Sequence, residues 1–350
     1  MLSYSNKIVQ EDLLDIYNSM LDFDKLDNKS ILITGATGML ATYIVYFLHY
    51  LNIEKNKNIK IFSLVRNKNK AEKLFKELLN DKNFIIIEQD ICEEIKLNEK
   101  IDLILHLASS ANPSAILNNP VSIVKANTIG TINVFELAKK SRSKIFFSST
   151  REIYGKIENI NQIKENDMGI CNCLEERACY PESKRISETI CKSYNLQYGI
   201  DYQIARIAHV YGPGMNIDND GRIMSDIISD VVNNRNIILK SAGTALRSFC
   251  YLSDATIGMF MILLNGKNNE VYNLSNEIEE ITIKDLAKLC KNLFPEKKLE
   301  VKYRISNDNK GYTNYKRVGL DNSKLYELGW RIKINLKKGI VKTVKSFEIG

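Results

Sequence analysis

The stretch ILITGATGMLA, residues 31–41, decides the fold because it joins a short apolar run to a glycine turn and then to a helical pattern. Gly35 and Gly38 follow the apolar run directly. Glycine at these points permits a tight turn and lets phosphate oxygens approach the N–H groups that open a helix. Ala41 stands where a third glycine would allow close packing of helix on strand, and alanine is small enough for that place.

The same order of strand and helix repeats along the chain. Further strands are expected at 59–65, 84–89, 102–108, 144–149 and 202–212, and helices at 39–52, 68–80, 121–140 and 181–198. Such alternation predicts an α/β protein with a Rossmann-like, doubly wound parallel sheet. Beyond residue 212, short strands mix with helices expected at 221–235, 253–265 and 282–293, which is typical of a smaller α/β lobe.

These patterns divide the chain into three expected parts. Residues 1–29 form an N-terminal helical extension, 30–210 a domain that binds NAD(P), and 211–350 a substrate-binding lobe, with room for the chain to cross back between lobes. In the extension, apolar side chains recur at helical spacing: Leu13, Leu14, Ile16, Tyr17 and Leu21. Residues 156–179 are polar and irregular, and a connection of that length is expected to be a functional loop.

Composition excludes several classes of function. The chain has 350 residues, of which 44% are apolar and 26% charged, as in ordinary soluble globular proteins. No apolar run is long enough for a membrane span, and we expect a cytoplasmic protein. The net charge of +7 comes without a dense basic run among aromatics, which favours an anionic small molecule over nucleic acid. The seven cysteines lack zinc-site spacing, so we expect reduced thiols and no metal.

The end of the second strand bears on the choice of cofactor. It reads LVRN, so that Arg66 stands where an acidic residue would hold a ribose hydroxyl. An arginine there would accommodate a ribose phosphate, and both NAD and NADP stay open. The residues expected to contact the cofactor are Gly35, Thr37, Gly38, Met39, Leu40, Arg66, Asp90, Ile91, Leu107, Ala108, Ser109, Tyr180 and Lys184.

A tyrosine and a lysine stand four residues apart in CYPESKR, residues 179–185. One helical turn places Tyr180 and Lys184 on the same face. A nearby ammonium stabilises a phenolate, so Tyr180 could act as a base below its ordinary pKa of about 10. Thr150 ends the preceding strand and is expected to hold a substrate hydroxyl against the same tyrosine.

With these motifs in this order, residues 30–335 resemble the extended short-chain dehydrogenase/reductases of the NAD-dependent epimerase/dehydratase family. Within it, the segments 176–191, 211–228 and 247–255 are most similar to UDP-glucuronate decarboxylases. The resemblance implies a nucleoside-diphosphate sugar as substrate. It also implies a homodimer formed through the helices near 121–140 and 180–198.

The same resemblance implies substrate contacts at three arginines, Arg222, Arg247 and Arg317. A planar guanidinium holds a phosphate or carboxylate bidentately and keeps its charge. His209 stands where related enzymes usually have asparagine. It is either a further substrate ligand or a buried structural histidine.

The stretch SSTREIYG, residues 148–155, departs from the family pattern. Related 4,6-dehydratases have aspartic acid between the threonine and the glutamate, and the decarboxylases have serine; this chain has Arg151. A guanidinium does not donate its proton at neutral pH, which argues against a plain dehydratase. Arg151 would either bind a sugar carboxylate or pair with Glu152 or Glu165.

The sequence thus predicts an enzyme that oxidises C4 of a nucleotide sugar, with UDP-glucuronate decarboxylation as the leading case. Thr150, Glu152, Tyr180 and Lys184 are the expected catalytic residues, and Glu152 would orient or protonate at C5. The alternatives are a 4-epimerase or 4-dehydrogenase, a 4,6-dehydratase, and a sensor that binds NAD(P) without turnover.

Overall fold

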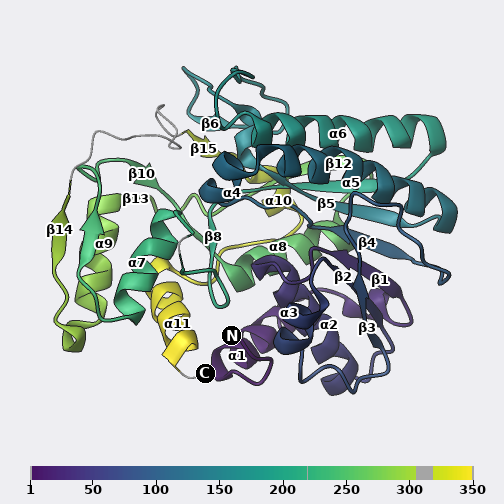
Figure 1. The fold of residues 1–350 in the computed structure, drawn as a ribbon, viewed down its shortest axis with the longest axis horizontal. Coiled ribbons are helices and arrows are strands. Elements are labelled where there is room, and N and C mark those ends of the chain that lie inside the picture. The colour runs from purple at the N-terminus through teal and green to yellow at the C-terminus, as the bar shows by residue number, and fades with distance from the viewer. Residues whose placement is uncertain (1, 219, 305–317, 349–350) are drawn as a thin grey trace.

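A single seven-stranded parallel sheet runs through the computed structural model, which describes residues 2–218, 220–304 and 318–348 (Figure 1). From one edge to the other, its strands are β12 (Glu270–Leu274), β7 (Tyr202–Ile207), β5 (Lys144–Thr150), β4 (Leu103–His106), β1 (Ser30–Thr34), β2 (Lys60–Val65) and β3 (Phe84–Glu88). Strand order reverses beside β1, as in doubly wound sheets. The predicted fold class is confirmed.

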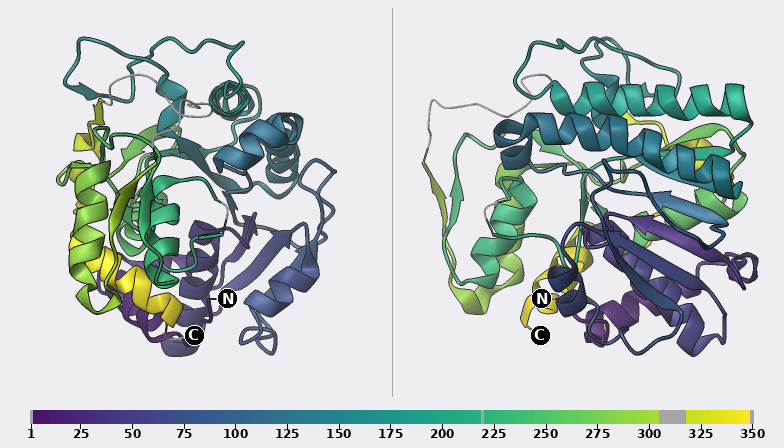
Figure 2. Two further views of the ribbon diagram at one scale, coloured as in Figure 1. Left: turned by 60° about the vertical axis from the view of Figure 1, so that its left-hand side comes forward. Right: turned by 45° about the vertical axis from the view of Figure 1, so that its right-hand side comes forward.

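Both faces of the sheet are covered because side chains alternate along each strand. In β1, Ile31 and Ile33 pack into one apolar cluster and Leu32 into another. The helices on the face of Leu32 are α5 (Pro120–Ser141) and α6 (Cys179–Tyr198), preceded by the short α4 (Pro113–Asn118). Helices α1 (Lys7–Tyr17), α2 (Met39–Glu54), α3 (Lys68–Leu74) and α8 (Leu252–Asn265) lie across the sheet from them (Figure 2).

A smaller lobe lies beside the sheet, at the left of Figure 1. Its elements are α7 (Ile223–Val232), β9 (Ile237–Leu239), β10 (Leu246–Arg247), β13 (Ile281–Thr282), α9 (Ile283–Leu293), η3 (Pro295–Lys297), β14 (Val301–Tyr303) and α11 (Leu336–Glu348). They share an apolar cluster of their own, which includes Ile228, Leu286 and Ile340. The sequence predicts a smaller lobe after residue 212, but the helix expected at 253–265 does not belong to it, because α8 packs on the large sheet.

Several helix and strand boundaries predicted from the sequence differ from those of the structure. The extension is helical only over α1, followed by η1 (Phe23–Leu26), and Leu14 is 47% exposed rather than packed. The expected strand 202–212 divides into β7 and β8 (Val210–Tyr211), because His209 between them has a φ of +47°. Helix α3 ends at Leu74 instead of near residue 80.

The chain crosses between the lobes more than once. Strand β12 follows much of the small lobe in sequence and yet pairs with β7 in the large sheet. Within the 156–178 loop, β6 (Gln162–Ile163) pairs with β15 (Gly319–Leu320), which precedes α10 (Ser323–Glu327). Strand β8 pairs with β11 (Cys250–Tyr251). We therefore retain the division into an extension and two lobes as a proposal, with these crossings added.

Asp12 in α1 joins distant parts of the chain. Its buried carboxylate accepts hydrogen bonds from the hydroxyls of Tyr43 at 3.0 Å and Tyr251 at 2.8 Å. It also pairs with Lys342 of α11 at 2.8 Å. The extension is thus fixed to both lobes, and the two ends of the chain lie side by side (Figure 1). None of the helices in the described ranges has the length and apolarity to cross a membrane.

Candidate active site

The turn after β1 has the geometry that a bound phosphate requires. Gly35 has a φ of +67°, and a Cβ added there would lie 2.7 Å from the Cα of Ala108. Any larger residue would therefore push the end of β4 away. Gly38 is the N-cap of α2, and within the described ranges no side chain caps the N–H groups that open this helix. Met39 and Leu40 open the helix, as predicted.

The segment after β4 is tied to the same turn. The hydroxyl of Thr34 accepts hydrogen bonds from the N–H groups of Leu107 and Ala108, both at 3.2 Å, and contacts His106 Nδ1 at 2.8 Å. Burial and the charge of Lys184 lower the pKa of His106 to about 3, so the ring is neutral. Ser109 has a buried hydroxyl with no hydrogen-bond partner within the described ranges. These residues fit a dinucleotide whose phosphates approach α2.

The other expected cofactor residues lie further along the sheet edge. Arg66 is exposed immediately after β2. Asp90 follows β3, and its carboxylate accepts a hydrogen bond from the N–H of Cys92 at 2.9 Å. Ile91 is buried against Gly130 of α5. Arg66 is thus available to a ribose or its phosphate, whereas Asp90 also has a structural role in its turn.

The expected catalytic residues converge at the carboxyl end of β5. Thr150 is the last residue of this strand, and it lies close enough to Tyr180, at the start of α6, for its side chain to lower the pKa of the tyrosine. One turn later, Lys184 is 3% exposed and its ammonium donates to the carbonyl of Ser148 at 2.8 Å. The end of β5 and the start of α6 thus lie together, and the catalytic role of these residues stays a prediction.

Burial shifts the pKa values of Tyr180 and Lys184 away from their usual values. Burial raises the pKa of Tyr180 above its usual value, and the charge of Glu152 adds to the effect. The side chain of Thr150 and the charges of Arg177 and Arg222 oppose this increase. Burial also lowers the pKa of Lys184 to about 7. Perturbed groups that meet at a sheet edge are typical of catalytic sites.

Glu152 lies beside this tyrosine and is held by an arginine that the sequence reasoning missed. It belongs to η2 (Arg151–Tyr154), whose start is capped by the hydroxyl of Thr150. Both carboxylate oxygens accept from Nη2 of Arg177 at 3.1 Å. Arg177 was present in the matched segment 176–191, three residues before Tyr180. Because it ends an irregular loop, no periodic pattern indicated which way its side chain points.

One expected substrate arginine approaches the site from the small lobe. Arg222 is the N-cap of α7, and its charge lowers the pKa of Tyr180. Its guanidinium binds the buried carboxylate of Asp220 through Nε at 2.5 Å and Nη2 at 3.0 Å. Asp220, which the sequence reasoning did not single out, therefore fixes the direction of Arg222.

The remaining residues expected to bind substrate are Arg151, His209, Arg247 and Arg317. Arg151 donates from Nη2 to the carbonyl of Val318 at 3.1 Å, next to the β6–β15 pair. His209 is exposed, so the alternative of a buried structural histidine was wrong. Arg247 is half-buried in β10. Arg317 lies outside the described residues.

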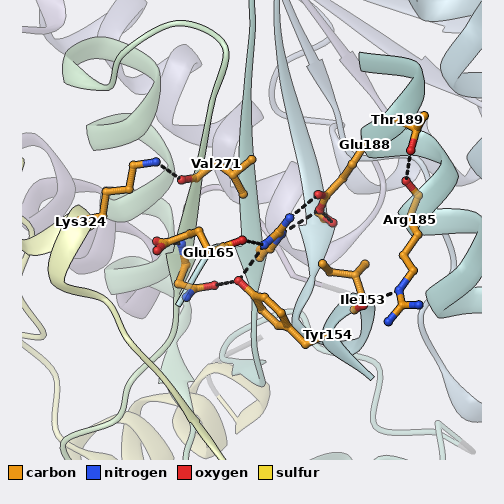
Figure 3. Close-up of polar contacts among 11 residues, drawn as sticks. Ile153, Tyr154, Glu165, Arg185, Glu188, Thr189, Val271 and Lys324 are labelled. Atoms are coloured by element: carbon orange, nitrogen blue, oxygen red, sulfur yellow. Dashed lines mark hydrogen bonds and ion pairs between the residues drawn. The ribbon is translucent and has the colours of Figure 1, made fainter. Parts of the chain in front are cut away.

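A buried ion pair joins β7 to α6, and Figure 3 shows its carboxylate, Glu188, near Tyr154. Arg206 of β7 binds Glu188 of α6 with two hydrogen bonds, at 3.1 and 2.6 Å, and also donates to the hydroxyl of Tyr154 at 2.9 Å. Glu188 accepts a further hydrogen bond from Ser149 at 2.5 Å. Since Ser149 precedes Thr150 and Glu188 lies one turn beyond Lys184, this pair fixes α6 against the end of β5.

Comparisons with known proteins agree with this geometry. Residues 31–275 match the model of the NAD dependent epimerase/dehydratase family. The chain belongs to this family. It is 34% identical to UDP-glucuronic acid decarboxylase 3 of Arabidopsis thaliana over 323 residues, which cover 92% of this chain and 90% of that protein. The resemblance predicted from the sequence is therefore confirmed.

Solved structures show the same fold. The UDP-glucose 4-epimerase of Thermotoga maritima superposes with a TM-score of 0.77 at 24% identity, over 91% of this chain and 98% of that one. The UDP-glucuronic acid 4-epimerase of Bacillus cereus, solved with UDP-glucuronic acid and NAD, gives 0.74 at 21% identity, over 91% and 99%. At these identities the likeness concerns the fold alone.

Proposed function

We propose that this protein decarboxylates UDP-glucuronate after oxidation of its C4 hydroxyl. The observation that carries the proposal is the grouping of Thr150 at the end of β5 with Tyr180 and the buried Lys184 at the start of α6, and with the Glu152 carboxylate that Arg177 holds. The identity to UDP-glucuronic acid decarboxylases over nearly the whole chain supports the choice of substrate. Arg222 and Arg247 are proposed to bind the nucleotide part.

The chemistry begins with a proton transfer at the C4 hydroxyl. A bound nicotinamide supplies the acceptor, and later the donor, of a hydride. Tyr180 takes the hydroxyl proton, Thr150 holds the same oxygen, and Lys184 favours the phenolate when charged. The 4-keto sugar is a β-keto acid, so the C5–C6 bond breaks, its electron pair passes to an enolate, and carbon dioxide leaves. Glu152 then orients the water or acid that returns a proton to C5.

The choice between NAD and NADP belongs to the same proposal. The family is described as NAD dependent, and we propose NAD as the cofactor. Arg66, exposed after β2, supports NADP as the second candidate, because a guanidinium there would pair with a ribose phosphate. Equilibrium binding of each dinucleotide to the wild type and to Arg66→Ala separates them, since only NADP binding should weaken strongly in the variant.

We also propose a homodimer and a cytoplasmic location. Several apolar side chains of α5 are exposed along one side of the helix: Val121, Val124, Ile129 and Ile132. At 100° per residue they fall within an arc of about 140°. Burying such a stripe against a second copy would remove apolar surface from water.

The proposed reaction is tested by incubating the protein with UDP-glucuronate and neutral nucleotide sugars, with NAD or NADP, and measuring product masses. Loss of carbon dioxide from UDP-glucuronate is expected. In Tyr180→Phe, turnover should fall by at least about a hundredfold, because the proton acceptor is gone. An unchanged mass would favour a 4-epimerase, and loss of water a 4,6-dehydratase. Full activity in Tyr180→Phe would contradict the mechanism.

A further inference from the structure

Arg177 is placed where it can control the geometry of Glu152. It is the second residue before α6, at the end of the long loop that follows η2. Its side chain is 17% exposed and that of Glu152 27%, so the pair is largely shielded from water. One nitrogen, Nη2, contacts both carboxylate oxygens at 3.1 Å, which holds the two oxygens at the same distance from the guanidinium.

The main chain of Glu152 is fixed by other groups. Its N–H donates to the hydroxyl of Thr150 at 3.2 Å, and its carbonyl accepts from the N–H of Gly155 at 3.1 Å. Two methylene groups still separate this fixed backbone from the carboxylate. Their torsions would remain free to change rotamer if no partner held the oxygens. Arg177 provides such a partner.

The loop itself is anchored without Arg177. Arg185 of α6 donates from Nε to the carbonyl of Ile153 at 2.6 Å and from Nη2 to that of Gly169 at 3.0 Å. Lys156 and Ile170 pair as an antiparallel bridge at the base of the loop. These contacts hold the loop in place without the contact between Arg177 and Glu152, so that contact can serve another purpose.

We propose that Arg177 is a positioning residue that holds the Glu152 carboxylate for the step at C5. The inference rests on the proposed decarboxylation. In that step the C5–C6 bond breaks, carbon dioxide leaves, and the electron pair forms a C4–C5 enolate. The enolate then takes a proton at C5 from a water molecule that Glu152 orients. Because a misplaced catalytic group lowers the rate even when substrate binds normally, Arg177 acts on kcat and not on KM.

The test is a double-mutant cycle on the full chain with UDP-glucuronate. Arg177→Gln should lower kcat by about 10- to 100-fold with KM changed less than about twofold. Combining it with Glu152→Gln should add little to the loss from Glu152→Gln alone, since residues that act as a unit are not additive. Arg177→Lys should recover part of kcat. The deuterium isotope effect on kcat from substrate labelled at C4 should shrink in Arg177→Gln, because the slow step moves to C5.

Arg185→Gln is the matched control, since it perturbs the same loop without contacting Glu152. The loss of kcat in Arg185→Gln should add to the loss in Glu152→Gln. The inference is overturned if Arg177→Gln and Glu152→Gln are additive, if Arg177→Gln raises KM alone, or if Arg185→Gln shows the same non-additivity. If the wild type releases no carbon dioxide but converts another nucleotide sugar, the proposed function is wrong. The double-mutant cycle is then measured with that sugar, and its additivity tests whether Arg177 positions Glu152. If no sugar is converted, both are overturned.

Discussion

At the scale of single residues, Lys184 illustrates how burial sets chemistry. Its ammonium lies 4.5 Å from the ring centre of Phe147 and donates to a carbonyl, and both contacts favour the charged form. Burial outweighs them and brings the pKa down to about 7. The lysine therefore changes charge near neutral pH, close to a tyrosine whose own pKa burial raises.

This pKa predicts how stability depends on pH. An unfolded lysine keeps its proton up to about pH 10.4, so from about pH 7 upward the unfolded state binds more protons than the folded state. The free energy of unfolding should then rise with pH, by up to about 1.4 kcal/mol per pH unit, relative to Lys184→Met. Urea unfolding of both proteins between about pH 6.5 and pH 9 measures the difference. A difference that stays constant over this range would contradict the prediction.

At the scale of elements, the contact between α6 and the sheet depends on a buried charge pair. The side chains of Arg206 and Glu188 are 7% and 12% exposed and pair at 2.6 Å. Removing one partner leaves a buried charge without compensation, whereas replacing both with apolar residues does not. The pair thus determines where α6, with Tyr180 and Lys184, lies relative to Thr150.

Arg206→Met should accordingly lower the free energy of unfolding by about 3–5 kcal/mol. Adding Glu188→Leu should restore much of the loss. Lys68→Met is a suitable control, because the Lys68–Glu72 pair is 53% and 42% exposed at 3.8 Å and should contribute less than about 1 kcal/mol. Denaturant unfolding compares the four proteins. If Arg206→Met and Lys68→Met lower the free energy of unfolding equally, the buried Arg206–Glu188 pair does not have the proposed structural role.

Most elements of the sheet and its helices could be predicted from sequence, because apolar periodicity marks each of them locally. The contact of Thr150 with Tyr180 was predictable for a similar reason, since a strand end and a helix start have defined directions. The partner of Glu152 was not predictable, because Arg177 lies in irregular chain. Strand β12 was also missed: its pairing with β7 brings together residues more than sixty positions apart.

At the scale of the whole molecule, the stripe on α5 is the feature that bears on assembly. Ile132 is 39% exposed at the C-terminal end of the stripe, close to the middle of α5. A charge placed there would be buried in the proposed dimer and would cost more than the association gains. Ile132→Glu should therefore sediment as a monomer at concentrations where the wild type is dimeric.

Ile53→Glu provides the comparison, since Ile53 is 55% exposed in α2, on the other side of the sheet. It should leave the dimer intact. Sedimentation equilibrium at several protein concentrations distinguishes the variants. A wild type that is monomeric throughout would overturn the proposed assembly.

The contacts of Asp12 with Tyr43, Tyr251 and Lys342 also bear on the order in which parts of the chain fold. Asp12 of α1 is synthesised before Lys342, so its buried carboxylate can pair with that ammonium only after another 330 residues have been made. Until then, α1 can pack on α2 only with a carboxylate that has the hydroxyl of Tyr43 but lacks its ammonium partner, which disfavours burial. Closure of the extension over both lobes should therefore be a late event on the ribosome, after the sheet has assembled from its own successive strands.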